Sequence, residues 1–425
     1  MEFELSKAID ISCKFDYNYI TVFNERRALE MTIKYPENVI KIAKIFADSG
    51  YKSYAVGGCI RDALMGKMPN DWDMTTDCSP EKMLEIFDAE GIRTIPTGLK
   101  HGTVSVLLDG EIYECTTFRI DGDYTDSRHP DRVTFTADIS EDLRRRDFTV
   151  NAMAGDPLSD GKIVDVFGGQ DDIEAKIIRA VGDPITRFNE DALRILRAIR
   201  FATVLGFDID EGTKTSVKAL GNRLEGISAE RKITELQKIL LSDNADRGIA
   251  LLIECDIAKY VHPDIISPKV PLFSLPNSFP TRLAALFGSV PDLSSMKLSN
   301  EITRKTKDLC DDVLYDKTSK KFSDNSANAR YMLAKYGDIA ADAAFLRGNS
   351  EFAELILSES AKSPAITIRD IAINGNDLIA LGIERQRLGD ILSLLLLSVI
   401  ENPSLNQKDI LISLSKKVYR KEKHV

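Results

Sequence analysis

Residues 56–76 read VGGCIRDALMGKMPNDWDMTT and carry the pattern that decides the fold of the N-terminal part of the chain. The apolar run that ends at Val56 predicts a short strand, and Arg61 lies in a helical segment that follows it. Gly57 and Gly58 are therefore expected at a strand-to-helix turn. Glycine at such a turn lets a phosphate group approach the backbone closely, so the turn is a candidate phosphate-binding site.

Two carboxylates, Asp71 and Asp73, follow a short way along the same stretch. Side chains two residues apart in an extended segment point to the same face, so these carboxylates are expected side by side. Carboxylate oxygens suit Mg²⁺, and a carboxylate pair facing a phosphate-binding turn can hold a metal-bound nucleoside triphosphate. Each motif alone is often only a turn or a solvated loop, but their joint spacing predicts a Mg²⁺ and nucleotide site.

Composition is typical of a globular protein with several domains. The chain has 425 residues and is 43% hydrophobic, which is enough for buried cores. Its six cysteines form no Cys-x-x-Cys motif, so neither a disulfide framework nor a zinc cluster is indicated. The four histidines are dispersed, which argues against a metallohydrolase built on clustered imidazoles. A reducing compartment, the cytoplasm, is expected.

Neither secretion nor membrane insertion is predicted. The N-terminus, MEFELSKAIDISCKF, lacks an apolar core of signal-peptide length. The most apolar run, ILSLLLLSVI at residues 391–400, is far shorter than the roughly 20 residues that a membrane span needs. We interpret it as a buried helix.

The formal net charge of −10 is unfavourable for a protein that contacts phosphates, but the distribution of charge matters more than the sum. Basic clusters occur at residues 144–146, 191–200 and 416–423. The last cluster is either a solvated face or an RNA-contacting surface.

The head region is expected to alternate helices and strands. Apolar spacing predicts a helix over residues 36–50, and Ser79-Pro80 predicts the start of another. Two β-rich runs, at residues 103–108 and 112–118, flank a turn and predict a hairpin. Glu114 lies in the second run and is either a third carboxylate beside Asp71 and Asp73 or an exposed strand residue. Residues 120–130 are rich in Gly, Asp, Ser and Pro and predict a mobile loop.

Two arginine-rich segments follow. Residues 144–146 are three adjacent arginines, whose forked donors suit triphosphate oxygens. Residues 187–201, RFNEDALRILRAIRF, are expected to form one helix that carries a polar row on one side and an apolar face on the other. An Asp beside an Arg can hydrogen-bond the Watson–Crick edge of a base, whereas the alternative is a solvent-exposed, salt-bridged helix. The row comprises Asp191, Arg194, Arg197 and Arg200.

Taken in order, these motifs resemble those of the nucleotidyltransferase superfamily that includes polymerase beta. They resemble most closely its class II tRNA nucleotidyltransferases, the CCA-adding enzymes. The resemblance rests on GG…RD…DxD, RRDFTVNAMA, the FGG turn at residues 167–169, the 187–201 segment and ISAER at 227–231, and it extends weakly to the C-terminal region.

The resemblance implies an α+β fold, with a polymerase-beta-like head of mixed β-sheet and helices followed by an all-α neck, body and tail. The implied divisions are an N-terminal extension at 1–35, a catalytic head at 36–180, a neck with base recognition at 181–260, a body at 261–365 and a tRNA-binding tail at 366–425.

It also implies roles for individual residues. Asp71 and Asp73 would be the catalytic metal ligands. Asp191 and Arg194 would read the base, with Arg197 and Arg200 supporting them. The remaining nucleotide contacts would come from Gly57, Gly58, Arg61 and Arg146.

The implied activity is template-independent addition of C, C and A to the 3′ end of tRNA, from CTP and ATP, with Mg²⁺ as cofactor. Relatives that add only CC have a shortened loop, whereas residues 120–130 are complete in length here, which favours A addition as well. The alternatives are an A-adding or CC-adding enzyme, a poly(A) polymerase, or an RNA-binding protein with an inactive head. The oligomeric state is not predicted.

Overall fold

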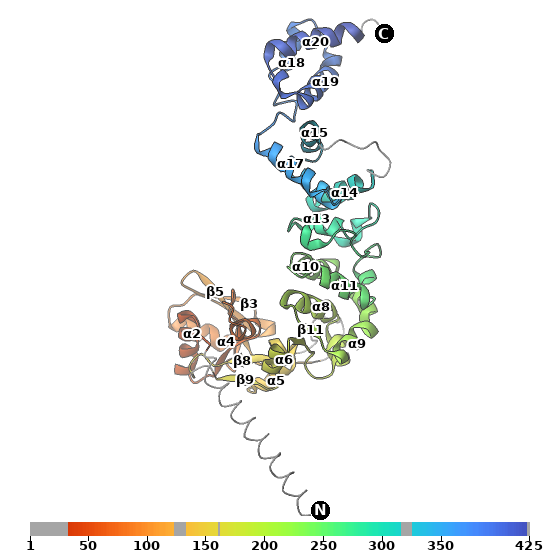
Figure 1. Ribbon diagram of the computed structural model, residues 1–425. Coiled ribbons are helices and arrows are strands. Elements are labelled where there is room, and N and C mark those ends of the chain that lie inside the picture. The colour runs from red at the N-terminus through yellow and green to blue at the C-terminus, as the bar shows by residue number, and fades with distance from the viewer. Residues whose placement is uncertain (1–32, 123–132, 160–161, 316–324, 423–425) are drawn as a thin grey trace, which may run out of the picture. The chain divides into compact units, whose positions relative to one another are not determined.

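The structure, a computed structural model, describes residues 33–122, 133–159, 162–315 and 325–422 (Figure 1). It divides into two compact units, Met1–Ile227 (unit 1) and Ser228–Val425 (unit 2), and the division falls inside the segment expected to form the neck. Most of the predicted loop at 120–130, nearly all of the N-terminal extension and the end of the 416–423 cluster lie outside the described residues.

Unit 1 contains a seven-stranded mixed sheet with the order β3-β4-β5-β2-β1-β8-β9. Its strand pairs are antiparallel except β2 with β5, which run parallel in the register Met74↔Cys115. The central strand β1 therefore lies between β2 and β8, so the turn after β1 and the segment before β2 meet in the middle of the sheet. The strands are β1 Ser53–Val56, β2 Met74–Thr76, β3 Thr94–Gly98, β4 Thr103–Leu108, β5 Glu111–Thr117, β8 Met153–Gly155 and β9 Ile163–Asp165.

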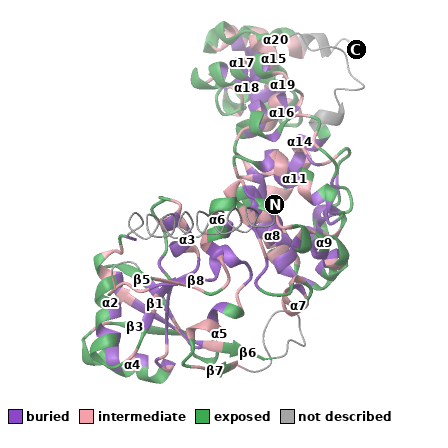
Figure 2. Cartoon of the chain, turned by 60° about the horizontal axis from the view of Figure 1, so that its bottom comes forward, coloured by how far each residue is buried: buried purple, intermediate pink, exposed green. Residues whose placement is uncertain are grey.

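Helices α2 (Glu37–Asp48), α3 (Gly58–Leu64) and α4 (Pro80–Ala89) build the core of the head with the sheet. The rings of Phe46 and Phe87 pack edge to face, with their centroids 5.2 Å apart. Figure 2 shows the buried residues gathered along the central strands, while α2 and α4 keep exposed outer faces. The predicted helix start at Ser79 is confirmed, because its side chain accepts a hydrogen bond from the Lys82 amide at 3.3 Å.

The predicted hairpin is also confirmed. Strands β4 and β5 pair up to Leu108↔Glu111, and the turn residues Asp109 and Gly110 have φ of 52° and 84°. Two successive positive φ values match the twist of the strands, which explains the Asp-Gly sequence. A second ribbon, β6 (Arg119–Asp121) with β7 (Val133–Phe135), follows.

The remaining part of unit 1 is mainly helical. The single helix expected over 187–201 is wrong: the chain forms α7 (Pro184–Glu190) and α8 (Leu193–Leu205), with a break at Asp191. Asp191 has an extended backbone (φ −138°, ψ 104°), and its carboxylate accepts a hydrogen bond from the Leu193 amide at 3.0 Å. An aspartate that bonds an amide at the start of a helix favours a new start over continuation. The other elements are α5 Ile139–Arg144, η2 Thr149–Asn151, α6 Gly169–Ala175, β10 Ile177–Ile178, β11 Asp208–Ile209, α9 Glu211–Leu220 and η3 Gly221–Gly226.

Unit 2 has helices and no strands among its described residues, and Figure 1 shows them running from α10, past α13 and α14, to α20 at the other end. The mixed-sheet head followed by a helical region is therefore the α+β fold that the sequence predicts. The helices are α10 Ala229–Leu240, α11 Ala245–Glu254, α12 Ala258–Val261, α13 Phe279–Ala284, α14 Asn300–Tyr315, α15 Ser326–Tyr336, α16 Ala340–Leu346, α17 Ser350–Ala361, α18 Gly375–Ala380, α19 Leu388–Glu401 and α20 Lys408–Glu422, with short 3₁₀ turns between some of them.

Helix α19 contains the apolar run at 391–400 and is buried on one side only. Ile391 and Leu395 are buried, whereas Leu394 and Leu397 are 42% and 44% exposed. The expectation of a buried helix was therefore only half right, because a helix at the edge of a helical layer presents one face to the core. Within the described parts of the chain, no helix combines the length and apolar character needed to span a membrane.

Candidate active site

The turn between β1 and α3 has the geometry that its two glycines predict. Gly57 has φ of 86°, a conformation that side-chain-bearing residues rarely adopt, and Gly58 begins α3. The Gly57 amide donates to the carbonyl of Met153 on β8 at 3.2 Å. A Cβ atom on Gly57 would lie 3.0 Å from Nη1 of Arg146, so the absence of a side chain lets that guanidinium come close to the turn.

The segment before β2 presents its two carboxylates on one side. Asp71 and Asp73 are exposed, whereas Trp72 between them is only 7% exposed. The carbonyl of Asp73 accepts a hydrogen bond from the Val56 amide at 2.9 Å, which ties this segment to the end of β1. The alternation expected from the Asp-Trp-Asp sequence is therefore confirmed, and it brings the carboxylate pair to the glycine turn.

Asp73 retains exposed surface, yet protein surrounds its carboxyl on enough sides for burial to raise its pKa. The charges of Glu114 and Asp71 raise that pKa further, while Arg146 opposes them. Glu114 is an exposed residue of β5, next to Cys115, which pairs with Met74. Glu114 is close enough to Asp73 for its charge to act on that carboxyl. No group of three or more His, Cys, Asp or Glu side chains suited to a metal is found in the described segments.

Arg146 and its neighbour Arg145 are held by one buried carboxylate, Asp142. Arg145 donates through Nε at 2.9 Å and Arg146 through Nη2 at 3.4 Å. Burial raises the pKa of Asp142, but the two guanidiniums outweigh it and lower the pKa below its usual range. Arg145 also lies 3.7 Å from the carboxylate of Asp121 on β6. Asp142 has no distinctive signal in the sequence, because a carboxylate followed by arginines is also typical of a solvated charge run.

A second network joins α3 to α8. Arg61 donates through Nη1 to the side-chain oxygen of Asn151 at 2.6 Å, and Asn151 donates to Asp147 at 3.3 Å. Asp147 then accepts from Nε of Arg197 at 2.7 Å. Although burial raises the pKa of Asp147, the guanidiniums of Arg197 and Arg194 lower it to about 2. Asn151 and Asp147 lie in the RRDFTVNAMA motif, which was the only sequence signal for them.

Asp191 and Arg194, the residues predicted to read the base, differ in burial and in backbone position. Arg194 is buried and donates to the carbonyls of Arg187 at 3.0 Å and Arg145 at 2.8 Å, and it pairs with Glu190. These three contacts use three of its five N–H donors. Asp191 is half-buried at the α7–α8 break. The expected row of four residues along one helix is thus reduced to three arginines on α8, with Asp191 at its start.

Three guanidiniums surround the ring of Phe201 on α8. The guanidinium carbons of Arg61, Arg197 and Arg200 lie 5.5, 5.2 and 3.8 Å from its centre. Cations stack favourably on an aromatic face, so Phe201 gathers positive charge from two elements. The structure thereby places Arg61 near the supporting arginines that the sequence assigned to a separate motif.

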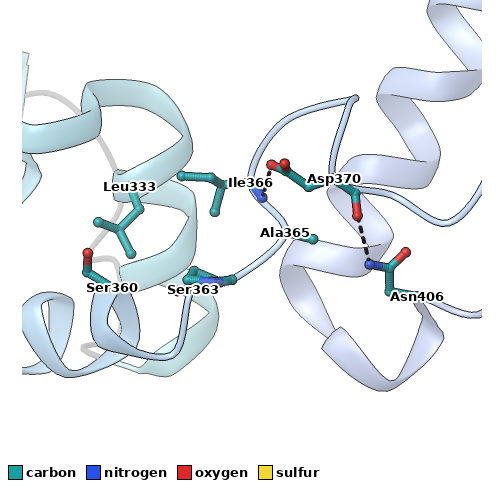
Figure 3. A pocket seen from close by; sticks show the side chains of 8 residues that line it. Leu333, Ser360, Ser363, Ala365, Ile366, Asp370 and Asn406 are labelled. Carbon is teal, nitrogen blue, oxygen red and sulfur yellow. Dashed lines mark hydrogen bonds between the residues drawn. The ribbon is translucent and has the colours of Figure 1, made fainter.

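A separate hollow of about 410 Å³ lies in unit 2 between the end of α17 and the segment that precedes α18 (Figure 3). Its polar groups form hydrogen bonds within the protein. The Asp370 carboxylate accepts a hydrogen bond from the Thr367 amide at 2.7 Å, and the Asn406 side chain donates one to the Asp370 carbonyl at 3.0 Å. No cluster of cations or carboxylates faces it, so its size does not make it the site of the chemistry. The lining residues are Leu333, Ser360, Ser363, Pro364, Ala365, Ile366, Asp370 and Asn406.

The mixed sheet, the glycine turn, the carboxylate pair and the arginines around them together define a nucleotidyltransferase head. Residues 53–179 match the family model of the poly A polymerase head domain. Residues 206–267 match a model described as the probable RNA and SrmB-binding site of polymerase A.

Similarity to characterised relatives identifies the family within the nucleotidyltransferases. The chain is 35% identical over 387 residues to the CCA-adding enzyme of Enterococcus faecalis. The matched region covers 87% of this chain and 92% of the Enterococcus enzyme. It therefore belongs to the CCA-adding enzyme family. The match to the Leuconostoc citreum enzyme is 47% identical but spans 213 residues, about half of each chain. A crystal structure of the Bacillus stearothermophilus CCA-adding enzyme in complex with CTP is 29% identical, with a TM-score of 0.75 over 91% of this chain and 98% of that one.

Proposed function

We propose that this protein adds C, C and A to the 3′ end of tRNA without a template, using CTP and ATP and releasing pyrophosphate. The observation that carries the proposal is the exposed Asp71–Asp73 pair beside the Gly57 turn and Arg146, in a chain of the CCA-adding enzyme family. A relative of similar fold is described in complex with CTP, which supports the nucleotide class.

The cofactor that we propose is Mg²⁺, held by Asp71 and Asp73. The donor set fits a hard cation, because the carboxylates of Asp71 and Asp73, with Glu114 nearby, offer the charged oxygen ligands that Mg²⁺ prefers. When bound, the metal would activate the 3′-hydroxyl of the tRNA and neutralise the triphosphate. The pH, redox state and Mg²⁺ content of the cytoplasm suit this chemistry, and we propose that compartment.

The protein's own side chains orient the nucleotide. Gly57, Gly58, Arg61 and Arg146 would contact the triphosphate, since they meet at one turn and the arginines offer forked donors. Fixing the phosphates there would direct the α-phosphorus toward the carboxylate pair, which is a positioning effect.

Base selection would fall to Asp191 and Arg194, with Arg197 and Arg200 behind them. Arg194 is fixed by carbonyls at residues 187 and 145 and keeps two N–H donors, enough for a bidentate contact with the acceptor atoms of a base. The carboxylate of Asp191 would accept a hydrogen bond from an exocyclic amino group, which both cytosine and adenine carry. The body (261–365) and tail (366–425) would contact the tRNA.

The test is incorporation of labelled CTP and ATP, separately and together, into a tRNA transcript that lacks its last three nucleotides. Growth by three residues only when both nucleotides and Mg²⁺ are present is expected. Growth that stops after two C residues would instead identify a CC-adding enzyme, and addition of A only to tRNA that ends in CC an A-adding one. Long A tracts on unrelated RNA would identify a poly(A) polymerase, and binding without incorporation an inactive head.

Asp71→Ala tests the metal assignment. Incorporation should fall at least about 100-fold, because a catalytic metal supplies several kcal/mol of transition-state stabilisation, while tRNA binding should persist. Asp88→Ala, which removes an exposed carboxylate at the end of α4, is the matched control and should retain activity. Full incorporation by Asp71→Ala would show that the metal is held elsewhere.

A further inference from the structure

Trp72 is the only tryptophan of the chain and separates the two carboxylates of the candidate metal site. Its side chain is buried in the head core, on the opposite side of the segment from Asp71 and Asp73. Because Trp72 stands between the two aspartates, the fit of its indole in the core fixes the backbone from which both carboxylates project. What holds Trp72 therefore decides how the pair is presented.

The neighbour that holds Trp72 is Tyr35, which lies just before α2. The two ring centroids are 5.5 Å apart, with an angle of 58° between the planes. Such tilted ring pairs have a preferred geometry, so each ring restricts the orientation of the other. Tyr35 belongs to the segment at 1–35 to which the sequence analysis assigns no function.

Tyr35 is itself fixed by close packing on β8. A Cβ atom on Gly155 would lie 2.1 Å from the Tyr35 hydroxyl oxygen, so the ring can reach this position only because residue 155 is glycine. Gly155 pairs with Ala55 on the central strand β1, which ends at the phosphate-binding turn. The hydroxyl is buried and has no hydrogen-bond partner among the described residues, so packing is what places the ring.

We propose that Tyr35 is a positioning residue of the nucleotidyltransfer reaction: wedged between Gly155 and Trp72, it sets the orientation of the Asp71–Asp73 pair for the metal. The inference rests on the proposed function, since it requires that this pair binds Mg²⁺. It predicts that metal affinity depends on a ring that touches neither the metal nor a substrate.

The experiment measures the Mg²⁺ affinity of the full-length protein from the fluorescence of Trp72. Mn²⁺ binding followed by electron paramagnetic resonance provides a readout that is independent of the tryptophan. The variants are Tyr35→Phe and Tyr35→Ala. Tyr51→Ala is the control, because Tyr51 packs against the same core and is partly buried as well.

Tyr35→Phe should bind both metals like the unmodified protein, because the ring remains. Tyr35→Ala should weaken binding about 3- to 10-fold, the factor that corresponds to one aromatic pair, and should lower kcat with little change in the KM for CTP. Tyr51→Ala should leave the metal affinity unchanged. If Tyr35→Ala does not fold, Tyr35→Leu replaces it with the same expected weakening.

Unchanged affinity in Tyr35→Ala, or equal weakening in Tyr51→Ala, would overturn the positioning role while leaving the metal site in place. Metal binding by the unmodified protein that Asp71→Ala does not alter would instead overturn the assignment of the site, and this inference with it. The two failures are therefore distinguishable.

Discussion

At the scale of single residues, the arginines of the site depend on buried carboxylates. Asp142 is buried among Arg145, Arg146 and the backbone of β6, and it also lies 3.4 Å from the hydroxyl of Thr75 on β2. It links the strand that follows the carboxylate pair to the guanidinium beside the glycine turn. Its charge is thus a structural requirement for placing Arg146.

Asp142→Asn should lower the free energy of unfolding by about 3 kcal/mol and raise the KM for CTP, because it removes the buried charge that holds the partly buried guanidiniums of Arg145 and Arg146. Urea denaturation and steady-state kinetics measure the two effects. Glu141→Gln is the control, since Glu141 forms only an exposed pair with Arg144 at 3.4 Å, whose removal should cost about 0–1 kcal/mol. Equal stability of the two variants would contradict the role of Asp142.

Asp147 makes stability depend on pH. Its pKa of about 2 in the folded protein lies below the ordinary value of 3.8, because Arg197 and Arg194 outweigh its burial. A depressed pKa contributes stability that is present above the unfolded pKa and lost as the pH falls toward the folded one. The contribution is about 2 kcal/mol at neutral pH and should disappear between about pH 4 and pH 2. The measurement is urea denaturation at a series of pH values. In Asp147→Asn the free energy of unfolding should fall less steeply between about pH 4 and pH 2 than in the unmodified protein, and an equal fall in both would refute this role.

Among the elements, the β1–α3 turn needs glycine at residue 57 for two reasons: the backbone has a positive φ, and the Arg146 guanidinium occupies the space of a side chain. Gly57→Ala should destabilise the protein by about 1–3 kcal/mol and reduce incorporation, because the new methyl group imposes strain and displaces Arg146. Gly66→Ala separates the two effects, since Gly66 has φ of 72° but open space around its Cβ position. It should lose stability and keep activity. Loss of activity in both variants would show that strain alone explains the effect.

The break between α7 and α8 is the other element that matters for the site. It turns Asp191 out of helical geometry. In the first turn of α8, Arg194 is anchored to the carbonyl of Arg187 on α7 and to that of Arg145, just after α5. A continuous helix would have placed all four polar residues in one exposed row. The observed arrangement instead fixes the guanidinium of Arg194 on two carbonyls, which is the anchoring that the proposed base contact would need.

On the scale of the whole molecule, the residues of the proposed nucleotide site all lie within unit 1. We expect scanning calorimetry to resolve two unfolding transitions. CTP with Mg²⁺ should raise the unfolding temperature of unit 1 only. The corresponding gain in its free energy of unfolding is about 2.7 kcal/mol when the ligand is present at 100 times its dissociation constant. Hydrogen exchange assigns the transitions, and ligand-dependent protection spread equally over residues 228–425 would contradict the expectation.

The local features of the site could be predicted from the amino-acid sequence. The glycine turn, the alternation of Asp71, Trp72 and Asp73, the Asp109-Gly110 hairpin and the Ser79 helix start follow from interactions between residues close in the chain. Backbone conformation, side-chain period and capping act over a few residues, so a linear pattern specifies them. The order of the motifs was sufficient to indicate the family.

Which side chains meet in the site depends on tertiary packing and could not be predicted from the sequence. Arg194 bonds the carbonyl of a residue 49 positions away, Arg197 bonds a carboxylate 50 positions away, and Tyr35 reaches Trp72 across the core. Such contacts depend on how the sheet and helices pack, so the hydrophobic periodicity of the sequence does not indicate them. The burial of Arg194 and Asp142 has the same origin, because a charge can be buried only where packing brings its partners to it.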